Sequence, residues 1–448
     1  MIKTHQNNLR QYIFIKEGPT MKKYSEMSPE ELAAEKELLT AQYKNWQAKG
    51  LKLDMSRGKP SVEQLNLSMP LFDILDGKSL MKCMNGVETR NYGQLEGIVE
   101  AQHLMAEIMD CQPEQVIVGG NSSLNLMFDA VSRGYMFGFD GCTPWCKLDR
   151  VKWLCPVPGY DRHFAITQHF GFDMINIPMN EDGPDMDVVE GLVAADDSIK
   201  GMWCVPKYSN PQGIVYSDEV VRRIANLKPA AKDFRVFWDN AYAVHHLYKE
   251  KSKILNILHE CEEADNPNLV FEFASTSKIT FAGGGIAAIA CNHNNREELK
   301  KTLTVQTIGF DKINMLRHAR YFADVESVSK HMEKHAKILR PKFELVIKTM
   351  ERDLTEPGCG SWISPKGGYF ITFEAPKGTA TRIVDLAAEA GVKLTPAGAP
   401  FPYHMDPNDS IIRFAPSLPP IEELEQAAEV FTVCARIAYV EKLLLKAQ

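Results

Sequence analysis

The 448-residue sequence contains no apolar run that approaches the roughly 20 residues a membrane-spanning helix requires. The one apolar stretch among the first twenty residues, Tyr12–Ile15, is too short for the core of a signal peptide. The net charge is −7, and no basic run interleaved with aromatic residues occurs. We therefore expect neither a membrane nor a nucleic-acid partner. Met21 opens a Met-Lys-Lys sequence that could be the natural start, which would make residues 1–20 an upstream extension.

Zinc-site spacings are also missing. Ten cysteines are scattered without a Cys-x-x-Cys pair, and the closest two, Cys142 and Cys146, have three residues between them. That spacing does not match the paired ligands of a zinc site, so we expect no metal. Free cysteines are commonly buried, and we interpret these as reduced thiols. Reduced thiols indicate a reducing compartment, so we expect a cytoplasmic protein.

Nucleotide-binding and metalloprotease motifs are incomplete. Asp76–Ser79 resembles the end of a P-loop, but Phe72 stands where the upstream glycine is required. His245 and His246 are adjacent, whereas metal-binding histidines on a helix are four residues apart. No Gly-x-Gly-x-x-Gly follows an expected strand. Common nucleotide and zinc chemistry is therefore not indicated.

What is present is an ordinary globular composition, with 44% apolar and 24% charged residues, and a chain long enough for two domains. From about residue 95, expected strands alternate with helices, which predicts an α/β domain with a largely parallel sheet. In such sheets ligands bind at the carboxyl ends of the strands. The expected strands are 115–118, 152–155, 174–178, 201–205, 234–238, 269–273 and 286–291.

The two ends of the chain have a different pattern. Ser28-Pro29-Glu30-Glu31 is typical of a helix start and precedes a helical segment to residue 49. A short strand is expected at 51–55, and a long helix at 328–353, which Pro341 could break. Strands at 368–373 and 411–414 and helices at 380–390 and 420–445 complete a smaller α+β region. We predict three parts: an N-terminal extension and arm (1–57), a large domain (58–320) and a small domain (321–448).

Lys278 follows the apolar strand 269–273 and lies between hydroxyls and glycines, in Ser275-Thr-Ser277-Lys278 and Gly283-Gly-Gly285. A desolvated lysine amine is a Schiff-base nucleophile. Hydroxyls and glycine amides beside it suit a phosphate. The combination indicates a lysine that holds a phosphorylated aldehyde, the chemistry of pyridoxal 5'-phosphate. A solvated surface lysine beside an ordinary loop is the alternative.

Polar residues follow three other expected strands. Ser122 and Ser123 begin a helix after Gly119-Gly120, where exposed amides suit an anion. An ordinary serine N-cap would give the same sequence pattern. Tyr160 follows a strand and could stack on a pyridine ring, or simply pack in a turn. Asn210, before Pro211, could donate its amide to a phenolate oxygen, although turn residues alone also explain this segment.

Asp239 ends an apolar strand, where a carboxylate needs a cation. A protonated pyridine nitrogen is such a partner, and its protonation makes the ring an electron sink. A protein lysine is the alternative partner. Tyr242, three residues on, could reach the ring phenolate.

These motifs together resemble the fold-type I pyridoxal-phosphate aminotransferases of class I/II, from about residue 28 to the end. The family motifs Asn-Pro-x-Gly and Asp-x-Ala-Tyr correspond to 210–213 and 239–242. The lysine motif corresponds to 275–278, the family's Tyr-x-x-x-x-Gly to 92–97, the N-terminal Gly-x-Pro to 58–60, and the C-terminal arginine strand to 411–414, after the turn 396–401.

The resemblance implies roles for these positions. Lys278 would form the Schiff base with the cofactor and shuttle the substrate α-proton. Asp239 would hold the ring nitrogen, Asn210 and Tyr242 the phenolate oxygen, and Tyr160 the ring face. Arg413 would bind the substrate α-carboxylate as a bidentate fork, helped by the Gly58 amide, beside Asn210. The phosphate would be bound by Ser122, Ser123, Ser275 and Ser277, with Tyr92 reaching it from the second subunit of a homodimer with shared sites.

The sequence departs from the family at Ile286, where most members have an arginine eight residues after the lysine, bonded to the phosphate. The phosphate would then be held by amides and hydroxyls, or by a basic group from elsewhere. This departure makes the chain similar to a divergent bacterial subgroup of aspartate aminotransferases.

The resemblance implies ping-pong transamination between amino acids and 2-oxo acids, and we expect aspartate and 2-oxoglutarate as substrates. A dicarboxylic substrate needs a second cation, for which Arg162 and Lys312 are the candidates. We prefer Arg162, because a guanidinium pairs with a carboxylate through two parallel bonds, although a helix-surface arginine is the alternative. An aromatic or kynurenine aminotransferase or a β-lyase of the same fold is the first rival function. A cofactor-binding transcription regulator is the second, but no basic recognition helix precedes Gly58.

Overall fold

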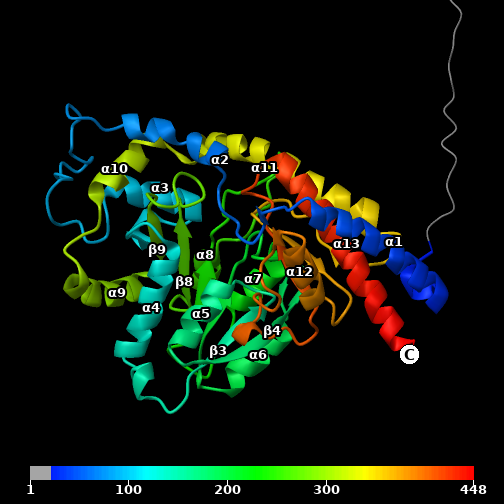
Figure 1. Ribbon diagram of the computed structural model, residues 1–448. Helices are drawn as coiled ribbons and strands as arrows, with labels where there is room; N and C mark the ends of the chain where they lie inside the picture. The colour runs from blue at the N-terminus through cyan, green and yellow to red at the C-terminus, as the bar shows by residue number, and fades with distance from the viewer. Residues whose placement is uncertain (1–21, 448) are drawn as a thin grey trace, which may run out of the picture.

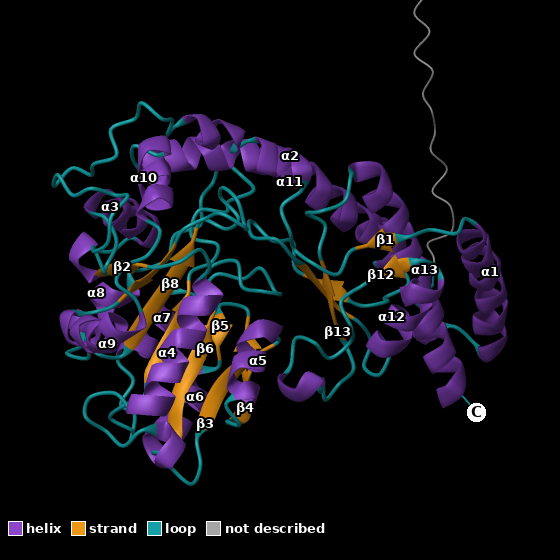
Figure 2. Cartoon of the chain, turned by 60° about the vertical axis from the view of Figure 1, so that its left-hand side comes forward, coloured by secondary structure: helices purple, strands orange, loops and turns teal. Residues whose placement is uncertain are grey.

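The structure is a computed structural model that describes residues 22–447. Its centre is an eight-stranded sheet in the order β2-β9-β8-β7-β6-β3-β4-β5 (Figures 1 and 2). Strands β8, β7, β6, β3 and β4 run parallel, whereas β9 is antiparallel to both of its neighbours and β5 to β4. The strands are β2 (Val116–Val118), β3 (Lys152–Val157), β4 (Asp173–Asn180), β5 (Gly183–Pro184), β6 (Ile199–Cys204), β7 (Arg235–Asp239), β8 (Val270–Ser275) and β9 (Ala287–Ala290).

Helices cover both faces of this sheet because the buried side chains of its strands alternate between two clusters. On one face, residues such as Val236 and Val270 pack against α3 (Val99–Met109), α6 (Met186–Ala195), α7 (Asp218–Ala225), α8 (Ile257–Glu263) and α10 (Lys312–Tyr321). On the other face, Phe237 and Phe271 pack against α4 (Ser123–Phe137), α5 (Asp161–His169) and α9 (His293–Gln306). The predicted α/β class with a largely parallel sheet is confirmed.

A second core lies around a three-stranded antiparallel sheet, β10 (Ser361–Trp362), β11 (Ile371–Glu374) and β13 (Ile411–Phe414). It includes α1 (Pro29–Ala48), α11 (Val325–Leu354), α12 (Ala380–Glu389) and α13 (Ile421–Lys446). Figure 1 shows α1 and α13, from opposite ends of the chain, side by side. Short β1 (Leu53–Asp54) pairs in parallel with β12 (Val392–Lys393), so the N-terminal arm is joined to this region. Five 3-10 turns and α2 (Val62–Asn66) complete the elements.

Local sequence explains where α1 begins. The Ser28 side chain accepts a hydrogen bond from the Glu31 amide, the Glu31 side chain accepts one from the Ser28 amide, and Pro29 is the first helical residue. The predicted helix start is therefore confirmed. Two other segments differ in detail from the sequence pattern. The strand expected at 51–55 is only two residues long, and α11 continues through Pro341 without a break.

The continuity of α11 follows from its burial. Leu339 and Phe343 flank the proline and are both buried in the second core, so packing on either side holds the helix together across the missing hydrogen bond. Within residues 22–447, no helix combines the length and apolar composition that a membrane span needs.

Candidate active site

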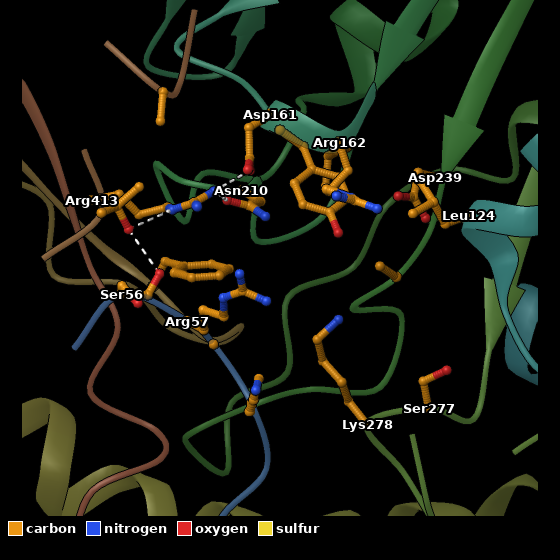
Figure 3. A pocket seen from close by; sticks show the side chains of 18 of the residues that line it. Ser56, Arg57, Leu124, Asp161, Arg162, Asn210, Asp239, Ser277, Lys278 and Arg413 are labelled. Carbon is orange, nitrogen blue, oxygen red and sulfur yellow. Dashed lines mark hydrogen bonds and ion pairs between the residues drawn. The ribbon is translucent and has the colours of Figure 1, made fainter. Parts of the chain in front are cut away.

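A cavity of about 890 Å³ lies where β3, β6, β7 and β8 end, between the eight-stranded sheet and β13 (Figure 3). It is lined by segments from the N-terminal arm, the starts of α4 and α5, the loop after β8 and the C-terminal region. The sequence-predicted residues that line it are Gly58, Ser122, Ser123, Tyr160, Arg162, Asn210, Asp239, Tyr242, Ser275, Ser277, Lys278 and Arg413. Residues far apart in the sequence are thus brought to one edge of the sheet, as the strand-end positions predicted.

Lys278 projects from the loop after β8 into this cavity (Figure 3). Its Nζ lies 5.0 Å from the centroid of the Tyr242 ring and 5.8 Å from that of the Tyr369 ring. Burial lowers the pKa of Lys278, and the negative charge of Asp239 opposes this shift. The net effect favours the free amine, which is the nucleophilic form of the side chain.

Asp239 is the last residue of β7 and is almost fully buried. Its Oδ2 lies 3.0 Å from Nε2 of His163, whose ring stacks on Trp203 at 4.5 Å between centroids. Its Oδ1 is buried and has no hydrogen-bond partner among the described residues. A buried carboxylate oxygen without a partner is costly, so the cavity holds a place for one donor or cation. The protonated nitrogen of a pyridine ring fits this place.

His163 was not predicted from the sequence, and the partner of Asp239 is this histidine rather than a lysine. Its position three residues after Tyr160 on α5 is the signal that could have identified it, because residues i and i+3 lie on the same helix face. The Tyr160 ring contacts the His163 ring edge-on at 4.9 Å between centroids.

The start of α4 offers an anion site. Ser122 is the N-cap, but its hydroxyl makes no capping hydrogen bond, and no acidic side chain lies in the first turn. The Ser275 hydroxyl donates to Ser277 Oγ at 3.1 Å, and the Ser277 hydroxyl donates to the Asn121 carbonyl at 3.2 Å. Free helix amides, the positive end of the helix dipole and these hydroxyls together suit a phosphate.

Ile286 lies behind this site rather than in it. The residue is buried, and its backbone amide donates to Thr276 Oγ1 at 2.9 Å. Within residues 22–447, no lysine or arginine side chain forms a hydrogen bond with Ser122, Ser123, Ser275 or Ser277. An anion at this point would therefore be held by amides and hydroxyls of this chain.

Arg413 lies in β13 at the other side of the cavity and is buried. Its Nη1 donates to Asp161 Oδ1 at 2.8 Å and to Asn210 Oδ1 at 3.2 Å (Figure 3). Because the Asn210 oxygen accepts from Arg413, the Asn210 amide group stays free to donate elsewhere. Phe370 lies beneath the guanidinium, 5.0 Å from it to the ring centroid. Asp161 was not predicted as part of the site.

Gly58 approaches Phe370 closely. A Cβ at this position would lie 2.6 Å from Phe370 Cζ, so a larger residue would displace the ring beneath Arg413. Arg57 also lines the cavity but was not predicted as a site residue. Its position next to Gly58 is the signal that could have identified it.

Both cavity tyrosines stay protonated near neutral pH. Burial, together with the negative charges of Asp239 and Asp161, raises the pKa of Tyr160 to about 12. Burial raises the pKa of Tyr242 well above its usual value. Each phenol can therefore donate a hydrogen bond into the cavity.

Basic side chains surround the cavity mouth. Arg57, Lys59, Arg162 and Lys393 all line the cavity, and none forms an ion pair with an acidic side chain of the described chain. Arg162 is exposed and Figure 3 shows its guanidinium within the cavity. Unpaired cations at this position favour a ligand with negative charge at more than one end.

Two predicted residues do not line the cavity of this chain. Tyr92 is 80% exposed, and Lys312, the first residue of α10, is buried. Figure 1 places α9 and α10 at the same end of the molecule, away from the C-terminal helices.

Comparisons with known proteins agree with this geometry. Residues 27–447 match the family described as aspartate amino-transferase. An aspartate aminotransferase from Corynebacterium glutamicum is 48% identical over 395 residues, which cover 88% of this chain and 91% of that protein. A crystal structure of an aspartate transaminase from the same species superimposes with a TM-score of 0.92 at 45% identity, covering 94% of this chain and 99% of the other.

A more distant structure shares the fold alone. An α-aminoadipate aminotransferase from Thermus thermophilus, complexed with N-(5'-phosphopyridoxyl)-L-leucine, has a TM-score of 0.69 at 20% identity. The likeness covers 91% of this chain and 96% of that chain. With the family match over nearly the whole sequence, the chain belongs to the aspartate aminotransferase family.

Proposed function

We propose that this protein is an aspartate aminotransferase that binds pyridoxal 5'-phosphate and passes the amino group of aspartate to 2-oxoglutarate. One observation carries the proposal: a desolvated lysine amine and a buried carboxylate oxygen without a partner share one cavity. When bound, the cofactor supplies an aldehyde carbon and an electron-withdrawing ring. The protein supplies its binding, orientation and proton transfers.

The binding roles follow from the free groups of the cavity. Asp239 Oδ1 would accept a hydrogen bond from the ring nitrogen, and Tyr160 would cover the ring. Tyr242 and the free Asn210 amide donate to the phenolate oxygen. The hydroxyls of Ser122, Ser123, Ser275 and Ser277 and the first amides of α4 hold the phosphate.

Lys278 holds the transferable proton. As a free amine, it would take the proton from the substrate α-carbon and deliver it to the aldehyde carbon of the bound cofactor, and it would move a proton in the opposite direction in the second half-reaction. One side chain would thus act as general base and then as general acid. Arg413 fixes the α-carboxylate, so that the α-carbon faces Lys278. Because both half-reactions use this single cavity, the first product leaves before the second substrate binds, giving ping-pong kinetics.

Substrate preference rests on the cations at the cavity mouth. Arg162 binds the side-chain carboxylate of aspartate or 2-oxoglutarate, since its guanidinium lines the cavity, forms no ion pair within residues 22–447 and can form two parallel bonds. An aromatic substrate would leave these charges without a partner.

The test is a donor panel with wild type and Arg162→Ala. Wild-type enzyme should show a Schiff-base absorbance that borohydride abolishes, and should transaminate aspartate with 2-oxoglutarate. Arg162→Ala should lower kcat/KM for aspartate by about 10- to 100-fold while changing that for phenylalanine little. An unchanged ratio of the two activities would reject the Arg162 assignment. Release of pyruvate without an oxo-acid acceptor would indicate a β-lyase instead.

We also propose that the active unit is a homodimer. Several large apolar side chains are exposed on the single chain: Leu80, Met84, Tyr92, Val305 and Ile308. Large apolar side chains that a single chain leaves exposed are candidates for burial in a protein interface. A second copy over this surface would bring Tyr92 of each subunit toward the other cavity, with Lys312 beside it at the start of α10.

A further inference from the structure

Apart from Asp239, Asp161 is the only acidic residue that lines the cavity among residues 22–447, and it is bonded to Arg413. We propose that Asp161 is an internal competitor for the substrate carboxylate: it occupies the Arg413 guanidinium in the free enzyme and is displaced when substrate binds. The inference rests on the proposed function, because Arg413 is there assigned to the α-carboxylate. It makes Asp161 a determinant of affinity for every substrate, whatever its side chain.

The bond between the two residues is short and partly shielded from water. The distance from Nη1 to Oδ1 is 2.8 Å, and 7% of the arginine side chain and 27% of the aspartate side chain are exposed. Charge-assisted bonds of this length are stronger than neutral ones, and reduced exposure weakens screening. The pair is therefore more than a loose surface contact.

The backbone of Asp161 is positioned by α5. It is the first residue of this nine-residue helix, where the helix dipole favours a negative charge. Its side chain makes no other hydrogen bond to the described chain. When the carboxylate moves away from Arg413, only the arginine loses a hydrogen-bond partner.

The guanidinium has one nitrogen fully occupied. Nη1 carries two hydrogens, and it donates to Asp161 and to Asn210. Nε faces Thr395 Oγ1 at 3.5 Å, and Nη2 has no acceptor in the described chain. A carboxylate binds best through two parallel N–H bonds, which a guanidinium offers at Nη1 and Nη2 or at Nε and Nη2. Asp161 occupies Nη1 and Thr395 faces Nε, so a substrate carboxylate that binds at the Nη1–Nη2 edge must take the place of Asp161.

The pair also joins two parts of the fold. Asp161 follows β3 of the eight-stranded sheet, whereas Arg413 belongs to β13 of the three-stranded sheet. Their contact crosses the cavity and orients Arg413 before substrate arrives. Asp161 thus has two opposed effects: its hydrogen bond orients the guanidinium, and its charge repels and competes with an incoming carboxylate.

Two substitutions separate these effects. Asp161→Asn keeps an oxygen acceptor for Arg413 but removes the charge, whereas Asp161→Ala removes both. Asp218 is the matched control, because it is likewise the first residue of a helix, α7, but lies on the surface. Asp218→Asn should behave like wild type in every measurement.

The experiment measures binding of two non-reacting acids to each holoenzyme by isothermal titration calorimetry: propionate, with one carboxylate, and succinate, with two. For Asp161→Asn we expect both acids to bind about three- to tenfold more tightly than to wild type. The KM values for aspartate and for 2-oxoglutarate should fall by a similar factor, with little change in kcat. Asp161→Ala should gain less affinity, because Arg413 is no longer oriented.

Propionate that binds Asp161→Asn no more tightly than wild type would overturn the proposal. So would a gain confined to succinate, because that result would assign the effect to the side-chain end of the ligand. Arg413→Ala should bind propionate at least tenfold more weakly than wild type, and unchanged binding would remove the premise. The calorimetric result does not depend on turnover, so a protein without aminotransferase activity would fail the proposed function while the competition for Arg413 could still be measured.

Discussion

At the scale of single residues, Asp239 illustrates how a buried carboxylate can be held in place while one of its oxygens stays available. His163 contacts only Oδ2, and the stacked Trp203 fixes the orientation of that imidazole. The other oxygen is left for a ligand. A lysine in place of His163 would neutralise the whole carboxylate, whereas an imidazole bonded to one oxygen holds the side chain and leaves its second acceptor directed into the site.

This arrangement predicts the effect of removing the charge. Asp239→Asn should lower kcat/KM for transamination by about 10²- to 10³-fold, the range for losing one electrostatic contact in a water-poor site. Steady-state kinetics with aspartate and 2-oxoglutarate would measure it. Asp173→Asn serves as a control, since Asp173 forms an exposed ion pair with Arg150 and should leave the rate unchanged. Comparable activity in Asp239→Asn and Asp173→Asn would contradict the role given to Asp239.

The residues that sequence reasoning found and missed differ in one physical respect. Asp239 ends a strand, and Asn210 and Lys278 each follow one, so their meeting at one edge of the sheet follows from topology alone. Asp161 is the first residue of α5 and His163 the third. Their partners, Arg413 and Asp239, are 252 and 76 residues away in the sequence. Nothing local specifies such pairings, which arise only when the sheets are assembled.

At the scale of elements, β8 contains a feature unrelated to ligand binding. Glu272, in the middle of this strand, is buried, and Asn240 Nδ2 donates to its Oε1 at 2.9 Å. Burial raises the pKa of Glu272 to about 8, while the hydrogen bond from Asn240 opposes the shift. The side chain is therefore protonated in the folded protein at pH 7, but ionised in the unfolded chain.

The sign of the resulting pH dependence follows. Between pH 4.5 and 8 the folded state keeps a proton that the unfolded state has lost, so the free energy of unfolding should fall as pH rises through this window. The fall is at most about 5 kcal/mol, because each pKa unit corresponds to about 1.4 kcal/mol. Glu272→Gln cannot ionise and should lose less stability between pH 5 and 8 than wild type. Urea unfolding at both pH values measures this.

Glu263→Gln provides the matched control, because Glu263 lies on the surface of α8. It should keep the pH dependence of wild type. If Glu272→Gln and wild type lose the same free energy between the two pH values, Glu272 is ionised in the folded protein and the assignment is wrong.

Elements were predictable where local pattern and burial agree. The core strands are short apolar runs, and α1 has a complete capping box, so both could be placed from sequence. The behaviour of α11 at Pro341 could not, because the cost of a proline inside a helix is local, whereas the packing of Leu339 and Phe343 that offsets it depends on the tertiary fold. The two-residue strands β1 and β12 likewise exist only through their pairing with each other.

At the scale of the whole molecule, the division into a large domain of residues 58–320 and a small domain of residues 321–448 stays a prediction. The cavity lies between two sheets, and the arm before residue 58 joins the second of them through β1. Within residues 22–447, the serines of the proposed phosphate site make no hydrogen bond to a lysine or arginine side chain of this chain. A group from a second copy would complete it, and exposed Tyr92 is the candidate.

Shared sites can be tested by mixing inactive subunits. Lys278→Ala and Tyr92→Ala should each have little activity alone. In a mixed dimer, one cavity has lost both groups, whereas the other takes Lys278 from one chain and Tyr92 from its partner and is intact. If half of the dimers are mixed and one of their two cavities is active, about a quarter of wild-type activity should return after denaturation and joint refolding. Size-exclusion chromatography would verify that dimers re-form.

Lys278→Ala mixed with Asp239→Asn is the control, because both residues belong to the same cavity of one chain and no mixed dimer restores an intact site. No return of activity in the mixture of Lys278→Ala and Tyr92→Ala, or full activity of Tyr92→Ala alone, would show that a cavity does not depend on Tyr92 of its partner.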